Sequence, residues 1–255
     1  LELYDGHDAT GLLAVPTQLK ALNDVQRGME TPYDTDSLHY VRTGGAIVTE
    51  TLVEQTHEHL CEAVYNTYGM TEAGADLTFA HPSAQEDHPG TIGKEAFSWE
   101  IRVVESPGLS KDPDPTATVD VGERGEIIAR GPGMSIGYID NDEAGKKSYF
   151  DGWLRTRDVA EVDEDGFLYI VDRVDNMIVS GGENIYPAAV ERVLGNHPDI
   201  AEACVFGRDD EEWGQIVTTV VVTEDGATVT EDALDEYCLQ HDGLADFKRP
   251  RACVI

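Results

Sequence analysis

Three short segments contain the residue types best suited to chemistry. The first, Tyr68-Gly69-Met70-Thr71-Glu72, follows a short apolar run. The Tyr68 ring offers a flat face to a purine base, and Gly69 lets the backbone approach a ligand closely. Thr71 offers a hydroxyl to phosphate, and Glu72 is a hard oxygen ligand for Mg²⁺. A tyrosine that ends a strand and an acid at a helix N-terminus would explain the same residues without any ligand.

The second and third segments lie in the second half of the chain. Asp158 ends the run Gly-Trp-Leu-Arg-Thr-Arg-Asp, at an expected strand start, and Arg173 follows an acidic turn. The third segment, Met177–Pro187, has glycine at two positions after Ser180, which suits a narrow ligand passage or a tight turn before the helix that begins at Pro187. By composition alone Asp158 is one acid among 50, so only the order of the three segments favours a functional role for it.

In this order the segments strongly resemble the adenylate-forming superfamily of acyl-CoA synthetases, luciferases and peptide-synthetase adenylation domains. The resemblance covers essentially the whole chain, and the tail at Trp213–Gln215 and Ala245–Pro250 is most similar to aryl-CoA ligases of the 4-chlorobenzoate type. It implies an AMP-forming acid–CoA ligase for an aryl or medium-chain acid. ATP, Mg²⁺ and CoA would be its cofactors.

The resemblance also implies which residues contact the nucleotide. Thr71 and Glu72 would be the catalytic residues, with Glu72 as the ligand of Mg²⁺. The further ATP or AMP contacts would come from Gly45, Ala46, Tyr68, Thr71, Asp158 and Arg173. Members of the superfamily commonly have Gly or Ser before that aspartate, whereas this chain has Arg157, which could crowd the ribose or add a phosphate contact.

Other residues would serve the acid and CoA. The small residues Gly44 and Gly74 indicate a roomy acyl pocket, and Asp175 would be the hinge between two orientations of a small domain. The full acyl-pocket set is Gly44, Thr67, Gly69, Gly74 and Ala75. The CoA set is Gly181, Gly182, Trp213, Phe247, Lys248 and Arg249. Each prediction has an alternative without a ligand. The glycines could form an ordinary turn, Asp175 could lie in a plain linker, and the basic residues could pair with the abundant acids.

Parts of that machinery are expected outside these 255 residues. The chain opens without Met, and the Ser/Thr/Gly-rich phosphate loop of the superfamily would precede its first residue. The catalytic lysine would follow Ile255, and the histidine before the acyl pocket is not found. We therefore expect a piece of a chain near twice this length, inactive by itself.

The composition excludes several function classes. The chain has 18 Lys and Arg against 50 Asp and Glu, a formal net charge of −32, which argues against partners such as nucleic acid or anionic lipid. No apolar run approaches the roughly 18–20 residues that span a bilayer, so no membrane insertion is expected. Acids spread evenly along the chain, with few lysines, favour a halophilic source. The cysteines (Cys61, Cys204, Cys238 and Cys253) are expected to be small buried hydrophobes in a reducing cytoplasm.

The elements that must position these residues begin as an α/β alternation. Hydrophobic spacing predicts strands at 12–15, 38–42 and 63–65, and helices at 18–25 and 50–60. Glycine-punctuated strands at 100–105, 125–130, 159–162 and 167–171 then indicate a small β subdomain, with a hairpin turn at 163–166.

The last third has the pattern of a separate α+β domain. A helix opens at Pro187, strands follow at 200–206 and 216–222, and Thr230 caps another helix. We predict an α/β part at 1–89 and a β subdomain at 90–173, together the C-terminal part of a large adenylate-binding domain. Residues 174–255 would be a small mobile domain, cut before the catalytic lysine. This is the C-terminal part of the adenylate-forming fold.

Two other functions stay open. An adenylation domain that loads a carrier protein would share the nucleotide residues but not need the CoA residues. A non-catalytic nucleotide-binding module would keep Tyr68, Asp158 and Arg173 without turnover. The resemblance also leaves a homodimer open.

The charge leads to a prediction about salt. We expect stability and activity to rise with KCl well past physiological strength, because the Debye length falls from about 30 Å at 0.01 M to about 3 Å at 1 M. A melting series from about 0.1 to 3 M KCl, with sucrose as the control for excluded-solute effects, measures this. A melting temperature that stays constant above about 0.15 M would reject the halophile interpretation.

Overall fold

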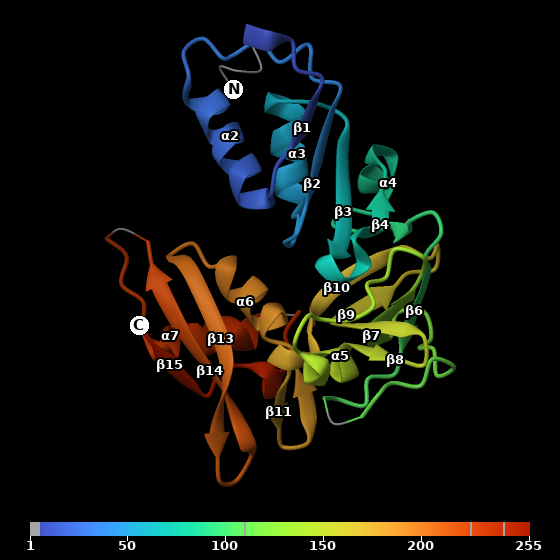
Figure 1. The fold of residues 1–255 in the computed structure, drawn as a ribbon. Helices are drawn as coiled ribbons and strands as arrows, with labels where there is room; N and C mark the ends of the chain where they lie inside the picture. The colour runs from blue at the N-terminus through green and yellow to red at the C-terminus, as the bar shows by residue number, and fades with distance from the viewer. Residues whose placement is uncertain (1–5, 110, 225, 242) are drawn as a thin grey trace. The chain divides into compact units, whose positions relative to one another are not determined.

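The computed structural model of the chain describes residues 6–109, 111–224, 226–241 and 243–255. The chain divides into two compact units (Figure 1). The first contains the residues up to Thr156 together with Ala160–Ile170, and the second contains Arg157–Val159 and Val171–Ile255. Among the described residues, no helix is both long and apolar enough to cross a bilayer.

A mixed five-stranded sheet opens the first unit. Its first three strands are parallel and its last two are antiparallel to their neighbours. The strand order is β1 (Gly11–Leu13), β2 (Tyr40–Gly44), β3 (Val64–Met70), β4 (Ala75–Ala80) and β5 (Lys94–Glu95). The helices are α2 (Pro16–Gly28), α3 (Glu50–His59) and α4 (Pro82–Asp87).

Local signals explain the two longer helices. Pro16 occupies the first turn of α2, where its missing N–H costs nothing, and Leu19 is buried in the core of this sheet. The Thr49 hydroxyl accepts a hydrogen bond from the Leu52 N–H and caps α3. Both predicted helices are confirmed, and α2 is longer at each end than its apolar spacing indicated.

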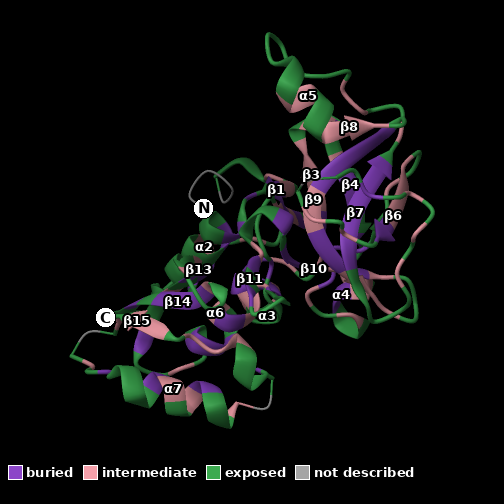
Figure 2. Cartoon of the chain, turned by 90° about the horizontal axis from the view of Figure 1, so that it is seen from below, coloured by how far each residue is buried: buried purple, intermediate pink, exposed green. Residues whose placement is uncertain are grey.

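A second sheet of antiparallel strands completes the first unit. β7 is buried on both faces from Gly125 to Ala129 (Figure 2). The order is β10 (Leu168–Arg173), β9 (Trp153–Val162), β7 (Arg124–Arg130) and β6 (Glu100–Val104), and β8 (Tyr149–Phe150) pairs with β9. The short helix α5 (Asp142–Ser148) precedes β8. The predicted hairpin turn is confirmed, since the Gly166 N–H donates to the Asp163 carbonyl.

A buried ion pair joins β7 to β9. Arg155 Nε donates to Glu126 Oε1 at 2.6 Å, and its Nη2 donates to Oε2 at 2.8 Å. The side chains are 3% and 0% exposed. The same guanidinium donates to the carbonyls of Gly108 and Lys111, so the pair also anchors the loop that contains them.

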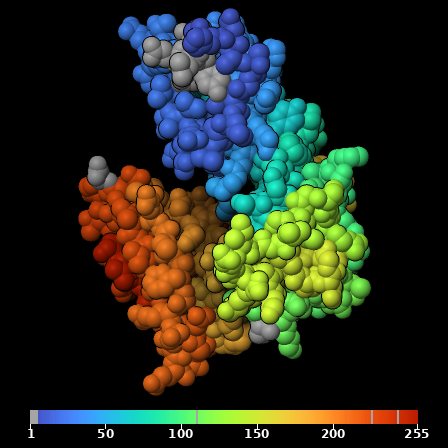
Figure 3. Space-filling view, viewed as in Figure 1, coloured from blue at the N-terminus to red at the C-terminus, as the bar shows by residue number. Residues whose placement is uncertain are grey.

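The second unit is a sheet with two helices. Its core packs α6 and α7 against the sheet, with Val190, Leu194 and Leu234 among the buried residues. The strands run β12 (Glu183–Ile185), β11 (Ile178–Ser180), β14 (Gly214–Thr223), β13 (Ile200–Asp210), with β15 (Ala252–Val254) parallel to β14. The helices are α6 (Pro187–Gly195) and α7 (Glu231–Gln240), and short 3₁₀ turns η2 (Val174–Asn176) and η3 (Asp246–Lys248) accompany them. The β13–β14 hairpin, orange in Figure 3, projects from this unit.

Several sequence predictions need correction. β3 continues through Met70 because β4 pairs with it, so Tyr68 lies inside the strand and not after it. Asp158 lies in the middle of β9, not at a strand start. Cys204 is exposed, because alternate side chains of β13 face opposite ways and its neighbour Val205 faces the core.

The buried ion pair makes a prediction about stability. Glu126→Gln should lower the free energy of unfolding by about 3–5 kcal/mol, because Arg155 is left buried without a partner charge. The control is Lys147→Ala, which breaks an exposed pair with Glu143 and should cost less than about 0.5 kcal/mol. Urea unfolding measures both, and equal losses would contradict the assigned role of the buried pair.

Candidate functional site

The carboxyl ends of β2 and β3 lie side by side at one edge of the first sheet. Gly44 pairs with Thr67 in register, and Gly45 and Ala46 follow as an exposed turn. A Cβ built on Gly44 would lie 2.1 Å from the Thr67 carbonyl oxygen. The absence of a side chain at Gly44 therefore permits β2 to pack closely against β3. The roomy acyl pocket expected from Gly44 and Gly74 stays a prediction. Carboxyl edges of this kind are where α/β sheets bind ligands.

The β3–β4 hairpin brings further predicted residues to this edge. Gly69 packs against the Ala75 backbone, and Met70 pairs with Ala75. The 3₁₀ turn η1 (Thr71–Ala73) joins the two strands, with Thr71 exposed and Glu72 half-buried. The predicted acyl-pocket residues and the predicted catalytic pair thus occupy one edge of one sheet.

The Tyr68 ring is half-buried among apolar side chains. It packs against the core clusters that contain Leu77 and Ile127, with Ile101 as a partly buried neighbour. This packing holds the ring in place while part of it stays accessible, as a stacking surface for a base requires.

Tyr138 is a site residue that sequence reasoning missed. Its hydroxyl donates to Glu72 Oε1, from the loop between β7 and α5. Burial, together with this bond to the Glu72 carboxylate, raises the pKa of Tyr138. A hydroxyl-bearing aromatic residue after Gly137, between the exposed Ile136 and Ile139, was the only local signal.

Glu72 is also a fitting single ligand for Mg²⁺. Among the described residues, no group of three or more His, Cys, Asp or Glu side chains could hold a metal ion. Mg²⁺ in nucleotide sites commonly uses one or two carboxylates together with substrate phosphates and water. One half-buried carboxylate with a neighbouring hydroxyl, that of Thr71, agrees with such a site.

The predicted ribose and hinge residues form a network of ion pairs in the second unit. Arg173 Nη1 lies 3.0 Å from Asp158 Oδ1, and its Nη2 lies 3.2 Å from Asp175 Oδ2. Arg157 Nη1 lies 3.4 Å from Asp175 Oδ1. Asp158 is 14% exposed, so its neighbours orient its carboxylate. The Arg157 side chain therefore reaches the predicted hinge residue.

The backbone at Arg157 explains why the superfamily commonly has glycine at this position, and leaves the arginine of this chain without a structural explanation. Its φ is +63°, in the left-handed region that glycine adopts without strain. Glycine before the aspartate, as the resemblance implied, suits this conformation directly.

Asp172 is a second residue that sequence reasoning missed. It is 7% exposed, and its Oδ1 accepts from the Arg173 N–H at 2.6 Å. Its Oδ2 accepts from the Ala188 N–H at 2.8 Å, at the start of α6. Asp172 therefore fixes the backbone of Arg173 against that helix.

Two of the predicted CoA residues pack directly against each other. The Gly181 N–H donates to the Trp213 carbonyl at 2.9 Å, and a Cβ on Gly181 would lie 2.8 Å from the indole ring. The Arg251 guanidinium also lies over this indole ring, with its central carbon 4.2 Å from the ring centroid. Arg251 extends the basic cluster that we recognised in the sequence only as far as Arg249.

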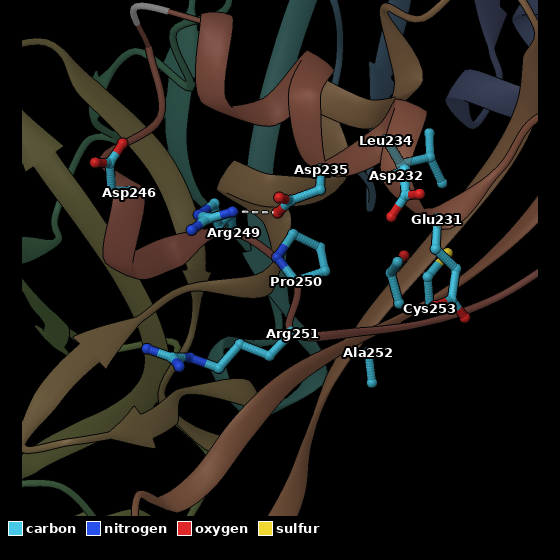
Figure 4. Close-up of a pocket in the computed structure, with 11 residues that line it drawn as sticks. Glu231, Asp232, Leu234, Asp235, Asp246, Arg249, Pro250, Arg251, Ala252 and Cys253 are labelled. Atoms are coloured by element: carbon cyan, nitrogen blue, oxygen red, sulfur yellow. Dashed lines mark hydrogen bonds and ion pairs between the residues drawn. The ribbon is translucent and has the colours of Figure 1, made fainter.

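The remaining predicted CoA residues lie around η3. Lys248 Nζ is 5.5 Å from the Phe247 ring centroid. Arg249 pairs with Asp235 of α7 in a cavity of about 390 Å³, next to Pro250 (Figure 4). Acidic side chains also line this cavity, so it is poorly suited to a phosphate.

Comparison with known proteins decides the family. Residues 1–139 match the family of AMP-binding enzymes, and residues 189–255 match the AMP-binding enzyme C-terminal domain. This chain belongs to the AMP-binding enzyme family. The first match contains the Tyr68–Glu72 segment and Tyr138, and the second contains Trp213 and the basic cluster.

Individual members of the family are clearly similar. The 2-succinylbenzoate–CoA ligase of Bacillus velezensis is 35% identical over 252 residues, 99% of this chain and 48% of that enzyme. The o-succinylbenzoate CoA synthetase (MenE) of Bacillus subtilis, in complex with the acyl-adenylate intermediate OSB-AMP, has a TM-score of 0.82 and 32% identity over 100% of this chain and 49% of that one. The same synthetase in complex with ATP and magnesium ion has a TM-score of 0.81 and 33% identity, over 99% and 49%.

The chain spans about half the length of the curated relatives it matches. Its fold is the C-terminal part of the adenylate-forming enzyme fold, as the sequence predicted. The finer resemblance to 4-chlorobenzoate ligases stays a prediction, while the relatives named above are 2-succinylbenzoate–CoA ligases.

The contact between Gly181 and Trp213 makes a testable prediction. Gly181→Ala should destabilise the chain by about 1–3 kcal/mol more than Gly182→Ala, because only the first methyl group meets the indole ring. Both positions have positive φ, at +59° and +87°, so the backbone cost is common to both variants. Urea unfolding with tryptophan emission measures the difference, and equal losses would contradict the packing.

Proposed function

We propose that this chain is part of an AMP-forming acid–CoA ligase. The observation that carries the proposal is the edge of the first sheet where Thr71, Glu72 and the Gly44–Ala46 turn meet, in a chain of the AMP-binding family. The relatives with this family assignment are named as 2-succinylbenzoate–CoA ligases. ATP, Mg²⁺, CoA and a carboxylic acid are then the proposed ligands.

The proposed reaction has two steps. The acid carboxylate attacks the α-phosphate of ATP, which forms acyl-AMP and releases pyrophosphate. The CoA thiol then attacks the acyl carbon, which forms the thioester and releases AMP. Mg²⁺, when bound, neutralises charge on the phosphates, and this supplies the main electrostatic contribution.

The residues of this chain have distinct proposed roles. Glu72 holds the cation and Thr71 contacts phosphate, while the Tyr68 ring and the turn of Gly45 and Ala46 cover the adenine. Asp158 accepts from the ribose hydroxyls with Arg173 beside it. Residues 1–173 and 174–255 would act as parts of a large and a small domain, with Asp175 as the hinge.

The acid is proposed to be an aryl carboxylate of the 2-succinylbenzoate class. The identity of the relatives supports this choice over a medium-chain fatty acid. Gly44, Thr67, Gly69, Gly74 and Ala75 are the proposed contacts at the sheet edge. For CoA, Gly181 and Trp213 are already in contact, and Phe247 and Lys248 are proposed to receive the nucleotide part.

Enzyme assays test the reaction itself. A full-length protein that contains this chain should release pyrophosphate with 2-succinylbenzoate and ATP, and should then form a thioester with CoA. Thioester formation with a carrier protein but not with CoA as acceptor would favour the adenylation-domain alternative. No release with any aryl or fatty acid at molar KCl would contradict the proposal.

Nucleotide binding tests Asp158 in the chain itself. Asp158→Asn should weaken AMP binding about tenfold or more, since a hydrogen bond to a charged group contributes about 1.5–3 kcal/mol. Glu161→Gln is the matched control, an acid-to-amide change on the same strand that should leave AMP affinity unchanged. Calorimetry with AMP and 2′-deoxy-AMP measures this.

The deoxynucleotide sharpens the test. If Asp158 accepts from the ribose, the loss from Asp158→Asn and the loss from the missing hydroxyl should not add. Full additivity of the two losses would remove Asp158 from the ribose site.

A further inference from the structure

The loop segment Gly131–Tyr138 packs closely over the turn that carries Glu72. The Ser135 N–H donates to the Glu72 carbonyl at 2.7 Å. A Cβ built on Gly133 would lie 3.0 Å from the Ala73 carbonyl oxygen, and one on Gly74 would lie 3.1 Å from the Gly133 carbonyl oxygen. The backbone of this segment therefore fixes the backbone of the turn.

The same segment also reaches the side chain of Glu72. The Tyr138 hydroxyl donates to Oε1 of that carboxylate, and Ser148 Oγ lies 3.4 Å from the same hydroxyl. Ser135 and Tyr149 share a further hydrogen bond through their hydroxyls. Tyr138 thus stands between Glu72 and the end of α5, which limits the positions that its ring can take.

A hydrogen bond to one carboxylate oxygen changes how the group can bind a cation. A carboxylate without partners can rotate and can present both oxygens, whereas Mg²⁺ demands near-ideal octahedral geometry. A donor on Oε1 fixes the rotation and leaves Oε2 as the oxygen available to a cation. Neighbours that orient a metal ligand in this way commonly matter 10- to 100-fold for metal affinity.

We propose that Tyr138 is a positioning residue for Glu72, which orients the carboxylate so that one oxygen binds the Mg²⁺ of the nucleotide. This inference rests on the proposed function, because it takes Glu72 as the Mg²⁺ ligand. It adds a residue 66 positions away in the sequence to the metal site.

Calorimetry of three variants of the 255-residue chain tests the role of Tyr138. ATP is titrated with and without Mg²⁺, and AMP is titrated as the metal-independent ligand. Tyr138→Phe should weaken ATP binding about tenfold in the presence of Mg²⁺, and should leave AMP affinity and the melting temperature nearly unchanged. Tyr149→Phe, which removes a hydroxyl from the same cluster without touching Glu72, should change none of these affinities.

Binding of Mn²⁺ in the presence of ATP, followed by electron paramagnetic resonance, gives a second readout. Tyr138→Phe should raise the Mn²⁺ concentration needed for the protein-bound signal, whereas Tyr149→Phe should not. An equal loss of ATP and AMP affinity, or equal effects of the two variants, would mean that Tyr138 only supports the fold and would overturn the inference.

Glu72→Gln tests the metal site separately from the role of Tyr138. If Glu72→Gln abolishes the Mg²⁺-dependent part of ATP binding but Tyr138→Phe has no effect, only the role of Tyr138 is wrong. If Glu72→Gln has no effect, or the unsubstituted chain shows no Mg²⁺-dependent ATP binding, the assigned metal site and this inference both fail.

Discussion

The close pairing of β3 with β4 is the constraint on which the position of Thr71 and Glu72 at the sheet edge depends. The two strands approach so closely that Gly69 has the Ala75 carbonyl where a side chain would be, and β2 approaches β3 in the same way at Gly44. The hairpin leaves only the short turn at Thr71–Ala73 to project from the sheet. Glu72 therefore lies at the sheet edge because the short turn between two paired strands holds its backbone there. The Tyr138 hydroxyl then orients its carboxylate.

Arginine side chains form the ion pairs that connect separate segments of this very acidic chain. Arg155 of β9 makes two bonds to Glu126 of β7 and two to loop carbonyls, a pattern that needs the planar fork of a guanidinium. Arg173 bridges Asp158 and Asp175 with different nitrogens. A lysine offers one compact charge and could not span either pair of partners. Because these ion pairs use arginine, the small number of lysines in the chain does not weaken them.

Local spacing located several of the helices and strands but not the long-range partners. The cap at Thr230 and the apolar repeat after Pro187 mark α7 and α6 correctly, because these signals lie within a few residues of each other. The bond from Tyr138 to Glu72 joins residues 66 positions apart, and the local hydrophobic pattern of the sequence cannot predict such a contact. The close packing at Gly44 could not be predicted for a related reason, since the atom that occupies its side-chain space belongs to another strand. The ligand contacts assigned by resemblance stay predictions.

The left-handed residue in the middle of β9 shows how the two units share one strand. Thr156 is fixed on one side by its hydroxyl, which donates to the Ile127 carbonyl at 2.8 Å, and Val159 is fixed on the other by packing with Val171, Val174 and Tyr186. A left-handed conformation costs an L-residue roughly 1–2 kcal/mol, and an exposed ion pair such as Arg157–Asp175 returns only about 0–1 kcal/mol. The strain is therefore stabilised mainly by the two buried neighbours. The boundary between the first and second units lies between Thr156 and Arg157, so the strained residue directly precedes Asp158.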